Sequence, residues 1–268
     1  MTPPARPNLL PRRSPWLFHH FRNYVRKYVA SRFHAVRLAR DGFQIGPGDG
    51  LAGPLLVVVS HPSWWDPMIG LILGEAWTDR IHFAPIDVAS LAKYRILERL
   101  GFFGVLPASS QGAREFLRRG AAILAEPNAV LWVTAQGKFV DPRARPIRLK
   151  EGVGHLLHRA STGHVLTLAL EYPFWNERNP EALARFSQPI PMNSPDRPNT
   201  PAAWTALLEQ TLESNQNALA AASITRNPAL FTTTQSGASG AGGLYDLARR
   251  LKSTLLRRPY TPEHGSVP

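Results

Sequence analysis

The stretch LLVVVSHPSWWDP, residues 55–67, joins a run of apolar residues to a polar turn. The apolar run predicts a strand buried on both faces and ending at Ser60. His61, Ser63 and Asp66 follow it, and ligands bind at the carboxyl ends of strands in open α/β sheets. Histidine suits proton transfer near neutral pH, and a carboxylate on its second ring nitrogen fixes its tautomer. We therefore expect His61 and Asp66 to pair at the mouth of a cleft.

On either side of this stretch, short apolar runs alternate with helical patterns. The expected strands are residues 43–45, 55–60, 80–85, 102–106, 129–134, 165–172 and 183–190. The expected helices are residues 67–76, 92–100, 111–125, 152–162 and 201–222. Such alternation is typical of α/β proteins with parallel strands. The sequence predicts a single α/β domain over residues 41–231, with a mixed, mainly parallel sheet flanked by helices.

The N-terminal region divides into two parts. Residues 1–15 are rich in proline and predict a disordered leader, and residues 16–40 combine apolar positions at helical spacing with basic residues and no acidic one. The apolar stripe consists of Leu17, Phe21, Tyr24, Tyr28 and Phe33, widened by Phe18, Val25 and Val29. This pattern predicts a basic amphipathic helix lying in a membrane interface. The alternative is a helix that packs on the domain and turns its basic face to solvent.

The C-terminal region also divides into two parts. Residues 232–243 are rich in glycine, serine and threonine, which predicts a flexible linker. Residues 244–268 place leucines at helical spacing among arginines and lysines, which predicts a basic amphipathic tail. Membrane contact and docking on the domain (or an unfolded tail) are equally compatible with this second pattern.

The positive charge lies at the two ends of the chain. Residues 1–40 hold nine basic and no acidic residues, residues 245–268 hold five against two, and residues 41–244 hold 17 of each. Nucleic-acid-binding proteins usually place their charge on the folded surface that docks, so we expect no nucleic-acid partner. Cationic ends on a neutral body fit an anionic membrane surface better.

Several other classes of protein are excluded or disfavoured. The chain has no cysteine, which rules out disulfides and thiolate metal sites. His155 and His158 lie three residues apart without a third ligand at suitable spacing, so we expect no metal. No apolar run approaches the roughly 18–20 residues that span a bilayer, and the N-terminus lacks the apolar core of a secretory signal. We expect a peripheral, monotopic protein on the cytoplasmic face of the cell membrane.

The spacing of His61 and Asp66, H-x4-D after a core strand, resembles the first motif of the glycerolipid acyltransferase family, which acylates lysophospholipids and 1-acylglycerol 3-phosphate. Residues 134–139, TAQGKF, resemble its F-P-E-G-T-R motif, with Gln136 in place of Glu, Gly137 matched and Lys138 in place of Thr. Residues 148–152, beginning with Arg148, resemble the family's basic segment before a helix. The resemblance covers about residues 40–190.

The resemblance implies an acyltransferase of phospholipid biosynthesis, with residues 41–231 as its catalytic domain. His61 would take the proton from the acceptor hydroxyl or amine, Asp66 would orient its ring, and no cofactor would be bound. The substrates would be a lipid acceptor and an acyl thioester, either acyl-CoA or acyl carrier protein. We expect five residues to bind substrate, namely Ser63, Gln136, Gly137, Lys138 and Arg148.

The chain departs from the family where the acceptor's phosphate would bind. Gly104 matches the second motif, but residues 107–109 are uncharged where an arginine is expected, and Gln136 lacks the charge of the usual Glu. We therefore expect lysophosphatidate to be a poor acceptor and another lysolipid, a glycolipid or an amine-bearing lipid to be preferred. The alternative function is a catalytically inactive membrane-binding relative.

Overall fold

The computed structural model describes residues 9–239 and shows one α/β domain around a nine-stranded mixed sheet. The strand order is β4-β3-β5-β2-β6-β7-β1-β9, with β8 pairing to β6. The five strands from β4 to β6 run parallel, whereas β7 is antiparallel to β6 and parallel to β1. The predicted fold class is therefore confirmed.

The bounds of the strands follow the expected alternation in the middle of the chain. The strands are β1 Ala35–Ala39, β2 Leu55–Val59, β3 Ile81–Asp87, β4 Phe102–Val105, β5 Ala129–Val133, β6 His164–Glu171, β7 Glu181–Phe186, β8 Ile190–Pro191 and β9 Phe231–Ser236. The α-helices are α1 Pro15–Arg32, α2 Asp66–Leu73, α3 Val88–Lys93, α4 Ser110–Ile123, α5 Gly152–Arg159 and α6 Pro201–Ile224. Short 3-10 turns η1 Gly74–Ala76, η2 Arg95–Arg99 and η3 Pro228–Leu230 complete the described chain.

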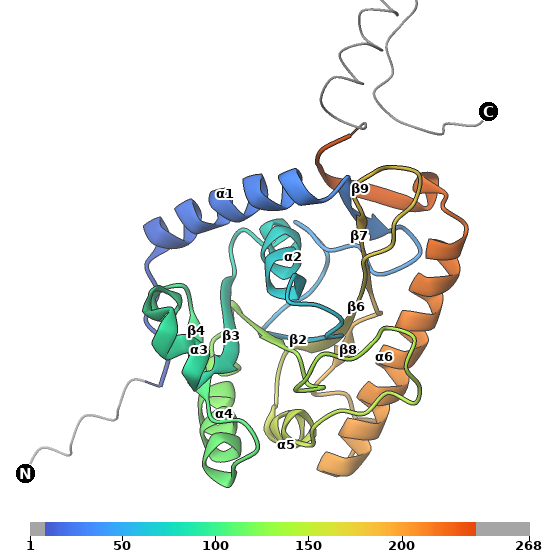
Figure 1. Cartoon of the computed structure of the whole chain (residues 1–268). Helices are drawn as coiled ribbons and strands as arrows, with labels where there is room; N and C mark the ends of the chain where they lie inside the picture. The colour runs from blue at the N-terminus through green and yellow to red at the C-terminus, as the bar shows by residue number, and fades with distance from the viewer. Residues whose placement is uncertain (1–8, 240–268) are drawn as a thin grey trace, which may run out of the picture.

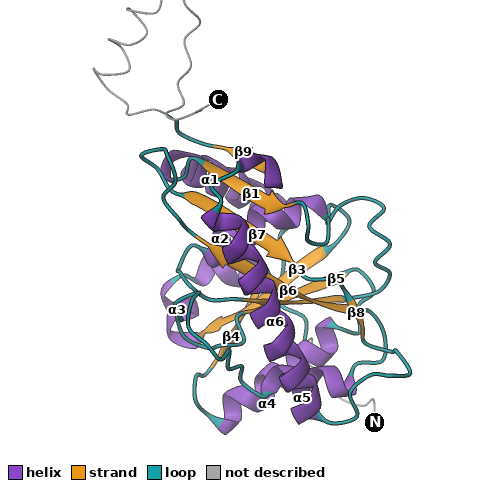
Figure 2. Cartoon of the chain, turned by 90° about the vertical axis from the view of Figure 1, so that its right-hand side faces the viewer, coloured by secondary structure: helices purple, strands orange, loops and turns teal. Residues whose placement is uncertain are grey.

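Strand β2 lies at the centre of the sheet, and its side chains alternate between two apolar layers. Leu56 and Val58 belong to the layer covered by α4, α5 and α6, and Val57 belongs to the layer covered by α1 and α2. Figure 1 shows these two sets of helices on either side of the strands, and Figure 2 shows α6 crossing the sheet. All five β2 residues are buried, as expected for a parallel strand covered on both faces.

The predicted bounds of the domain were wrong at both ends. The helix predicted over residues 16–40 ends at Arg32, and Ala35–Ala39 form β1. Phe231–Ser236 form β9, antiparallel to β1, where the sequence predicted a linker from residue 232. The threonines of β9 favour a strand once a partner strand is present, so the folded domain extends beyond residues 41–231 at both ends.

Other expectations need smaller corrections. Residues 43–45 form no strand, and the strand expected over residues 183–190 is divided between β7 and β8. Arg13, in the predicted disordered leader, forms a β-bridge with Leu100. Residues 1–8, the end of the predicted linker and the predicted tail lie outside the described residues.

Helix α1 packs on the domain. Phe18, Val25 and Val29 are buried, while Arg22 and Arg26 reach Glu75 at 3.5 and 3.0 Å. The alternative of a helix that packs on the domain is therefore correct for one face of α1. Tyr24, from the same predicted apolar stripe, is exposed to solvent. Within residues 9–239 no helix has both the length and the apolar character needed to cross a bilayer.

Candidate active site

His61 and Asp66 form a close pair just beyond the carboxyl end of β2. Nδ1 of His61 lies 2.7 Å from Oδ2 of Asp66, and the Ser63 backbone N–H donates to the same oxygen at 3.1 Å. Asp66 is the first residue of α2 and is 2% exposed, and a carboxylate is stabilised at a helix N-terminus. The predicted pairing is confirmed.

Tyr172, the residue after β6, completes the hydrogen bonding of Asp66. Its hydroxyl donates to Oδ1 of Asp66 at 2.7 Å. Burial, and then the neighbouring Asp66 carboxylate, hold the pKa of Tyr172 well above its usual range. Tyr172 therefore stays a neutral donor to Asp66 at any physiological pH.

The backbone of His61 is held by the segment that follows β5. Gln136 accepts a hydrogen bond from the His61 backbone N–H at 2.8 Å through Oε1, and the Val140 backbone N–H donates to the His61 carbonyl at 2.9 Å. These two bonds fix the histidine turn against the end of the neighbouring parallel strand.

The hydrogen bonds assign one tautomer to His61. Because the carboxylate of Asp66 can only accept, Nδ1 of His61 carries the hydrogen and Nε2 has the free lone pair. A neutral histidine in this state can accept a proton at Nε2 and then share the resulting charge with Asp66.

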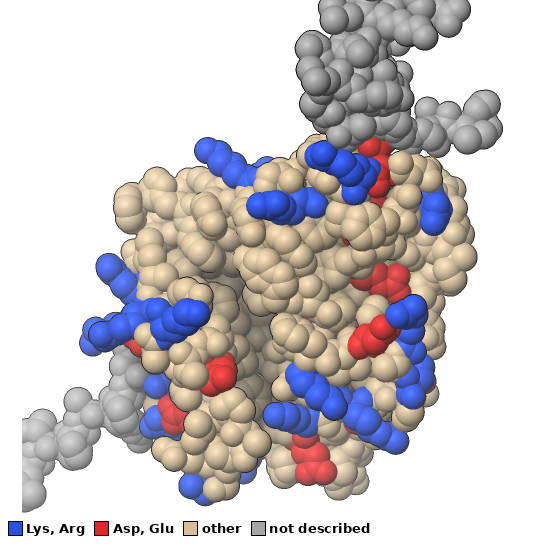
Figure 3. Space-filling model, in the orientation of Figure 1, with Lys and Arg blue, Asp and Glu red and all other residues tan. Residues whose placement is uncertain are grey.

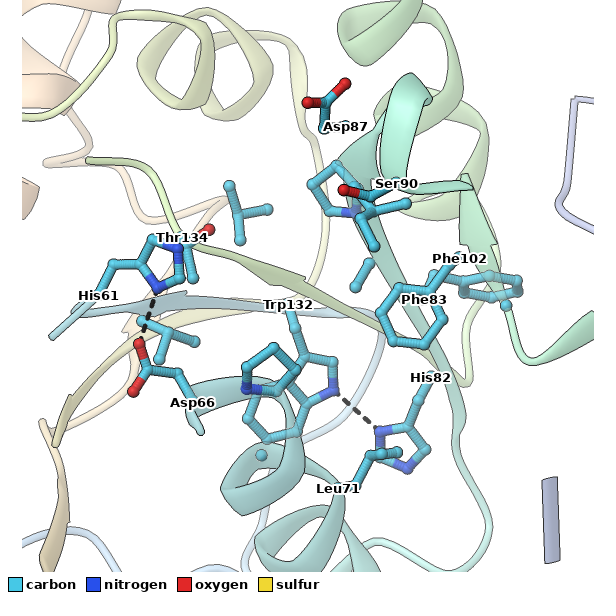
Figure 4. Close-up of a pocket in the computed structure, with 18 of the residues that line it drawn as sticks. His61, Asp66, Leu71, His82, Phe83, Asp87, Ser90, Phe102, Trp132 and Thr134 are labelled. Carbon is cyan, nitrogen blue, oxygen red and sulfur yellow. Dashed lines mark hydrogen bonds and ion pairs between the residues drawn. The ribbon is translucent and has the colours of Figure 1, made fainter. Parts of the chain in front are cut away.

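The pair opens on a cavity of about 660 Å³, within the usual range for ligand pockets. The cavity forms where β3 leaves β5: β3 pairs with β5 over residues 81–83 and with β4 over residues 84–87. Its lining is mostly apolar and includes Val59, Pro67, Leu71, Phe83, Pro85, Ile86, Phe102, Val105, Trp132 and Val133. Figure 4 shows His61 and Asp66 on one side of this cavity and His82 on another.

His82 and Trp132 line the part of the cavity next to α1. The indole N–H of Trp132 donates to Nδ1 of His82 at 3.0 Å, and the His82 ring stacks with Phe18 at 6.1 Å. Burial, and then nearby Arg13, lower the pKa of His82 to about 4. This histidine is therefore neutral near pH 7 and adds no charge to the cavity wall.

The mouth of the cavity combines aromatic and charged groups. The ring of Phe139 lies 4.5 Å from that of His61, and Trp64 is 51% exposed. The side chain of Lys150 packs over Gly137, which has a φ of +68°. A Cβ atom at position 137 would lie only 2.7 Å from Nζ of Lys150. Glycine at position 137 therefore leaves space for a lysine at the rim.

The five residues predicted to bind substrate do not all reach the cavity. Gly137 lines it, whereas Ser63 and Gln136 hold the histidine turn by hydrogen bonds. Lys138 is exposed and does not line the cavity. Arg148, also outside the lining, reaches Glu209 of α6 at 3.5 Å. Of the five, Gly137 alone therefore lines the cavity, and the substrate-binding roles of the other four stay predictions.

Two residues of the site, Lys150 and Tyr172, were missed. Lys150 stands in the basic segment that the sequence singled out, two residues after Arg148. Tyr172 follows β6, and β6 lies next to β2 in the sheet. Knowing that these two strands are neighbours would have indicated that Tyr172 lies close to Asp66. Among the described residues, no three His, Asp or Glu side chains lie close enough to share a metal ion.

The fold and site define an α/β domain with a His–Asp pair at the mouth of an apolar cavity. No family model matches the sequence, and no curated protein matches it. Among solved structures, the chain is similar to the 1-acyl-sn-glycerophosphate (LPA) acyltransferase PlsC from Thermotoga maritima, with 15% identity and a TM-score of 0.46. The match covers 76% of this chain and 78% of that one.

Proposed function

We propose that this protein is a membrane-surface acyltransferase that moves a fatty acyl group from a thioester to a hydroxyl or amine of a lipid acceptor. The observation that carries the proposal is the His61–Asp66 pair, joined at 2.7 Å, at the mouth of the apolar cavity. A general base beside a large apolar cavity fits an acyl substrate better than a polar one.

In the proposed reaction, Nε2 of His61 takes the proton from the acceptor as its oxygen or nitrogen attacks the thioester carbonyl. The new C–O or C–N bond forms a tetrahedral intermediate, and the C–S bond then breaks. The thiolate leaves and takes the proton from His61, which restores the neutral ring. Asp66 stabilises the imidazolium through its contact with Nδ1.

The apolar cavity would hold the acyl chain. Gly70 of α2 and Gly74, the first residue of η1, line it, and a Cβ atom at these positions would lie 3.6 and 3.3 Å from Trp132. The two glycines therefore let the Trp132 indole pack closely against this segment and form part of the apolar wall. Burial of each methylene group contributes about 0.8 kcal/mol. A donor of the acyl-CoA or acyl carrier protein type would place its thioester at the mouth, beside His61.

Exposed aromatic rings beside the mouth favour membrane contact. Trp16 and Tyr24 on α1 are 70% and 59% exposed. Ring contacts lead from Tyr24 through Tyr28 to Trp65 and Trp64, with centroid separations of 6.0, 5.4 and 4.6 Å. Tyrosine and tryptophan favour the level of the lipid headgroups, so this surface would bring the cavity mouth to the lipid acceptor.

The test is an acyl-transfer assay of the full chain with vesicles, a panel of lysolipids and an acyl-CoA or acyl carrier protein donor, followed by mass spectrometry. His61→Ala should lower the rate by about 10²–10⁴, and His158→Ala, an exposed residue of α5, should leave it unchanged. Vesicle binding without transfer to any acceptor would instead support the alternative of a catalytically inactive membrane-binding relative.

A further inference from the structure

The mouth of the cavity carries a carboxylate and an ammonium group on different walls. Asp87 lies where β3 meets α3, and Lys150 lies across Gly137 beyond β5. We propose that these two residues form a subsite for a zwitterionic headgroup, in which Asp87 binds an ammonium group of the lipid acceptor and Lys150 binds its phosphate. The proposal rests on the acyltransferase function proposed above and specifies its acceptor.

Asp87 is held in place but keeps one oxygen for a ligand. It caps α3 by accepting a hydrogen bond from the Ala89 backbone N–H at 2.9 Å through Oδ1. The side chain is exposed and lines the cavity together with Ser90. Within residues 9–239 no lysine or arginine forms an ion pair with it. Its second oxygen is therefore available to a cation that enters the mouth.

Lys150 is the matching cation on the other wall. Its backbone N–H donates to the Ala135 carbonyl at 2.8 Å, which anchors the residue beside the end of β5. Arg143 and Arg148 reach Asp141 and Glu209 at 2.7 and 3.5 Å, whereas no carboxylate in the described chain pairs with Lys150. An ammonium group on a flexible stem binds a phosphate as a point charge.

The placement of the two charges argues for an acceptor with charges of both signs. Figure 4 shows Asp87 and Ser90 across the cavity from His61 and Thr134, and Figure 3 shows both acidic and basic side chains around the hollow. A headgroup with only negative charge would be attracted by Lys150 and repelled by Asp87. A headgroup that joins a phosphodiester to a primary amine would satisfy both.

The test compares two lysolipids that share a phosphodiester and differ in the group beyond it. Lysophosphatidylethanolamine carries an ammonium group, and lysophosphatidylglycerol carries hydroxyls. The full chain should use the first with a kcat/KM about fivefold higher, which is the scale of one partly exposed ion pair. Asp87→Asn should abolish this preference, because asparagine keeps the helix cap but loses the charge. Lys150→Met should lower kcat/KM for both acceptors.

Asp79→Asn, which removes an exposed carboxylate that does not line the cavity, is the matched control and should keep the preference. Equal kcat/KM for the two lysolipids in the unmodified protein would overturn the subsite and leave the proposed acyl transfer intact. Transfer to neither lysolipid, nor to any other acceptor in the panel, would instead refute the acyl-transfer proposal. Calorimetric binding of the two lysolipids, below their micelle concentrations, would then test the subsite directly: binding with equal affinity, or no binding, would overturn it.

Discussion

The Tyr172 hydroxyl donates a 2.7 Å hydrogen bond to Oδ1 of Asp66, while His61 occupies the other carboxylate oxygen. Tyr172, the residue after β6, therefore holds the carboxylate that orients His61, two residues beyond the end of β2. Because β2 and β6 are neighbouring parallel strands, a rigid sheet sets the distance between them. Tyr172 acts on the proposed reaction through Asp66 and is a positioning residue.

Tyr172→Phe should lower kcat about tenfold and change KM little, because a hydrogen bond to a charged group contributes about 1.5–3 kcal/mol and only part of it acts on the transition state. Steady-state kinetics would measure this, and urea unfolding would show whether the variant remains folded. Tyr28→Phe, which removes a hydroxyl group but keeps the ring contact with Trp65, should leave kcat unchanged. A rise in KM at constant kcat would mean that Tyr172 contacts substrate and does not act through Asp66.

The central part of the site could be predicted from the sequence because its signals are local. Five apolar residues define β2, and His61 and Asp66 are separated by a single turn. Gln136 was predicted to contact substrate, but it holds the His61 backbone across 75 residues of sequence. Such a contact depends on which strands are neighbours, and periodicity does not encode strand order.

The edges of the domain were mispredicted for a related reason. Ala35–Ala39 continue the apolar pattern of α1, and Arg37 among them resembles another cation of a helix. In the structure Arg37 donates to Glu181 of β7 at 2.8 Å, which makes a buried position acceptable for its charge. Neither β1 nor β9 shows a strong strand pattern in its own sequence. In the structure β1 pairs with both β7 and β9, and β9 pairs with β1.

The aromatic surface of α1 should contribute to vesicle binding. Replacing both Trp16 and Tyr24 with Ser should weaken binding to anionic vesicles by tenfold or more, on the basis of about 1.5–3 kcal/mol for each large apolar side chain fully buried. Co-sedimentation would measure it. Deletion of residues 1–38 would be a poor test, because it removes most of β1 along with the helix.

Ile224→Ser is the control for this pair of substitutions, since Ile224 is an exposed apolar residue on α6. It should leave vesicle binding unchanged. Binding that persists after the double substitution but disappears at high salt would assign the attraction to the basic residues instead.

His34 should make the fold more stable at low pH. Its Nδ1 lies 2.6 Å from Oε1 of Glu181, and this hydrogen bond raises the pKa of His34 in spite of partial burial. A pKa that is raised in the folded state adds stability. This added stability is complete below about pH 6.5, the ordinary pKa of histidine, and is lost as the pH rises through the pKa of His34 in the folded protein. His34→Gln should therefore cost more stability at pH 5.5 than at pH 8.5.

Urea unfolding at the two pH values would measure this difference. His19→Gln, at an exposed histidine of α1, is the matched control. An equal loss of stability from His34→Gln at both pH values would show that the contact contributes packing or a neutral hydrogen bond, without linkage to a proton.

His82 should have the opposite effect on the pH dependence of stability. Burial lowers its pKa to about 4, with a further contribution from Arg13. The unfolded chain binds a proton to this histidine below about pH 6.5, whereas the folded protein resists protonation until about pH 4. Stability is therefore lost as pH falls through this window, by roughly 2–3 kcal/mol at pH 4.5.

The variant His82→Gln removes the titrating ring and keeps an acceptor for the Trp132 indole N–H. Its free energy of unfolding should fall less than that of the unmodified protein between pH 7.5 and pH 4.5, because the carboxylates that titrate in this range are the same in both. Urea unfolding at the two pH values gives the comparison. An identical decrease in both proteins would show that His82 becomes protonated inside the fold without cost, and hence that this wall of the cavity is accessible to water.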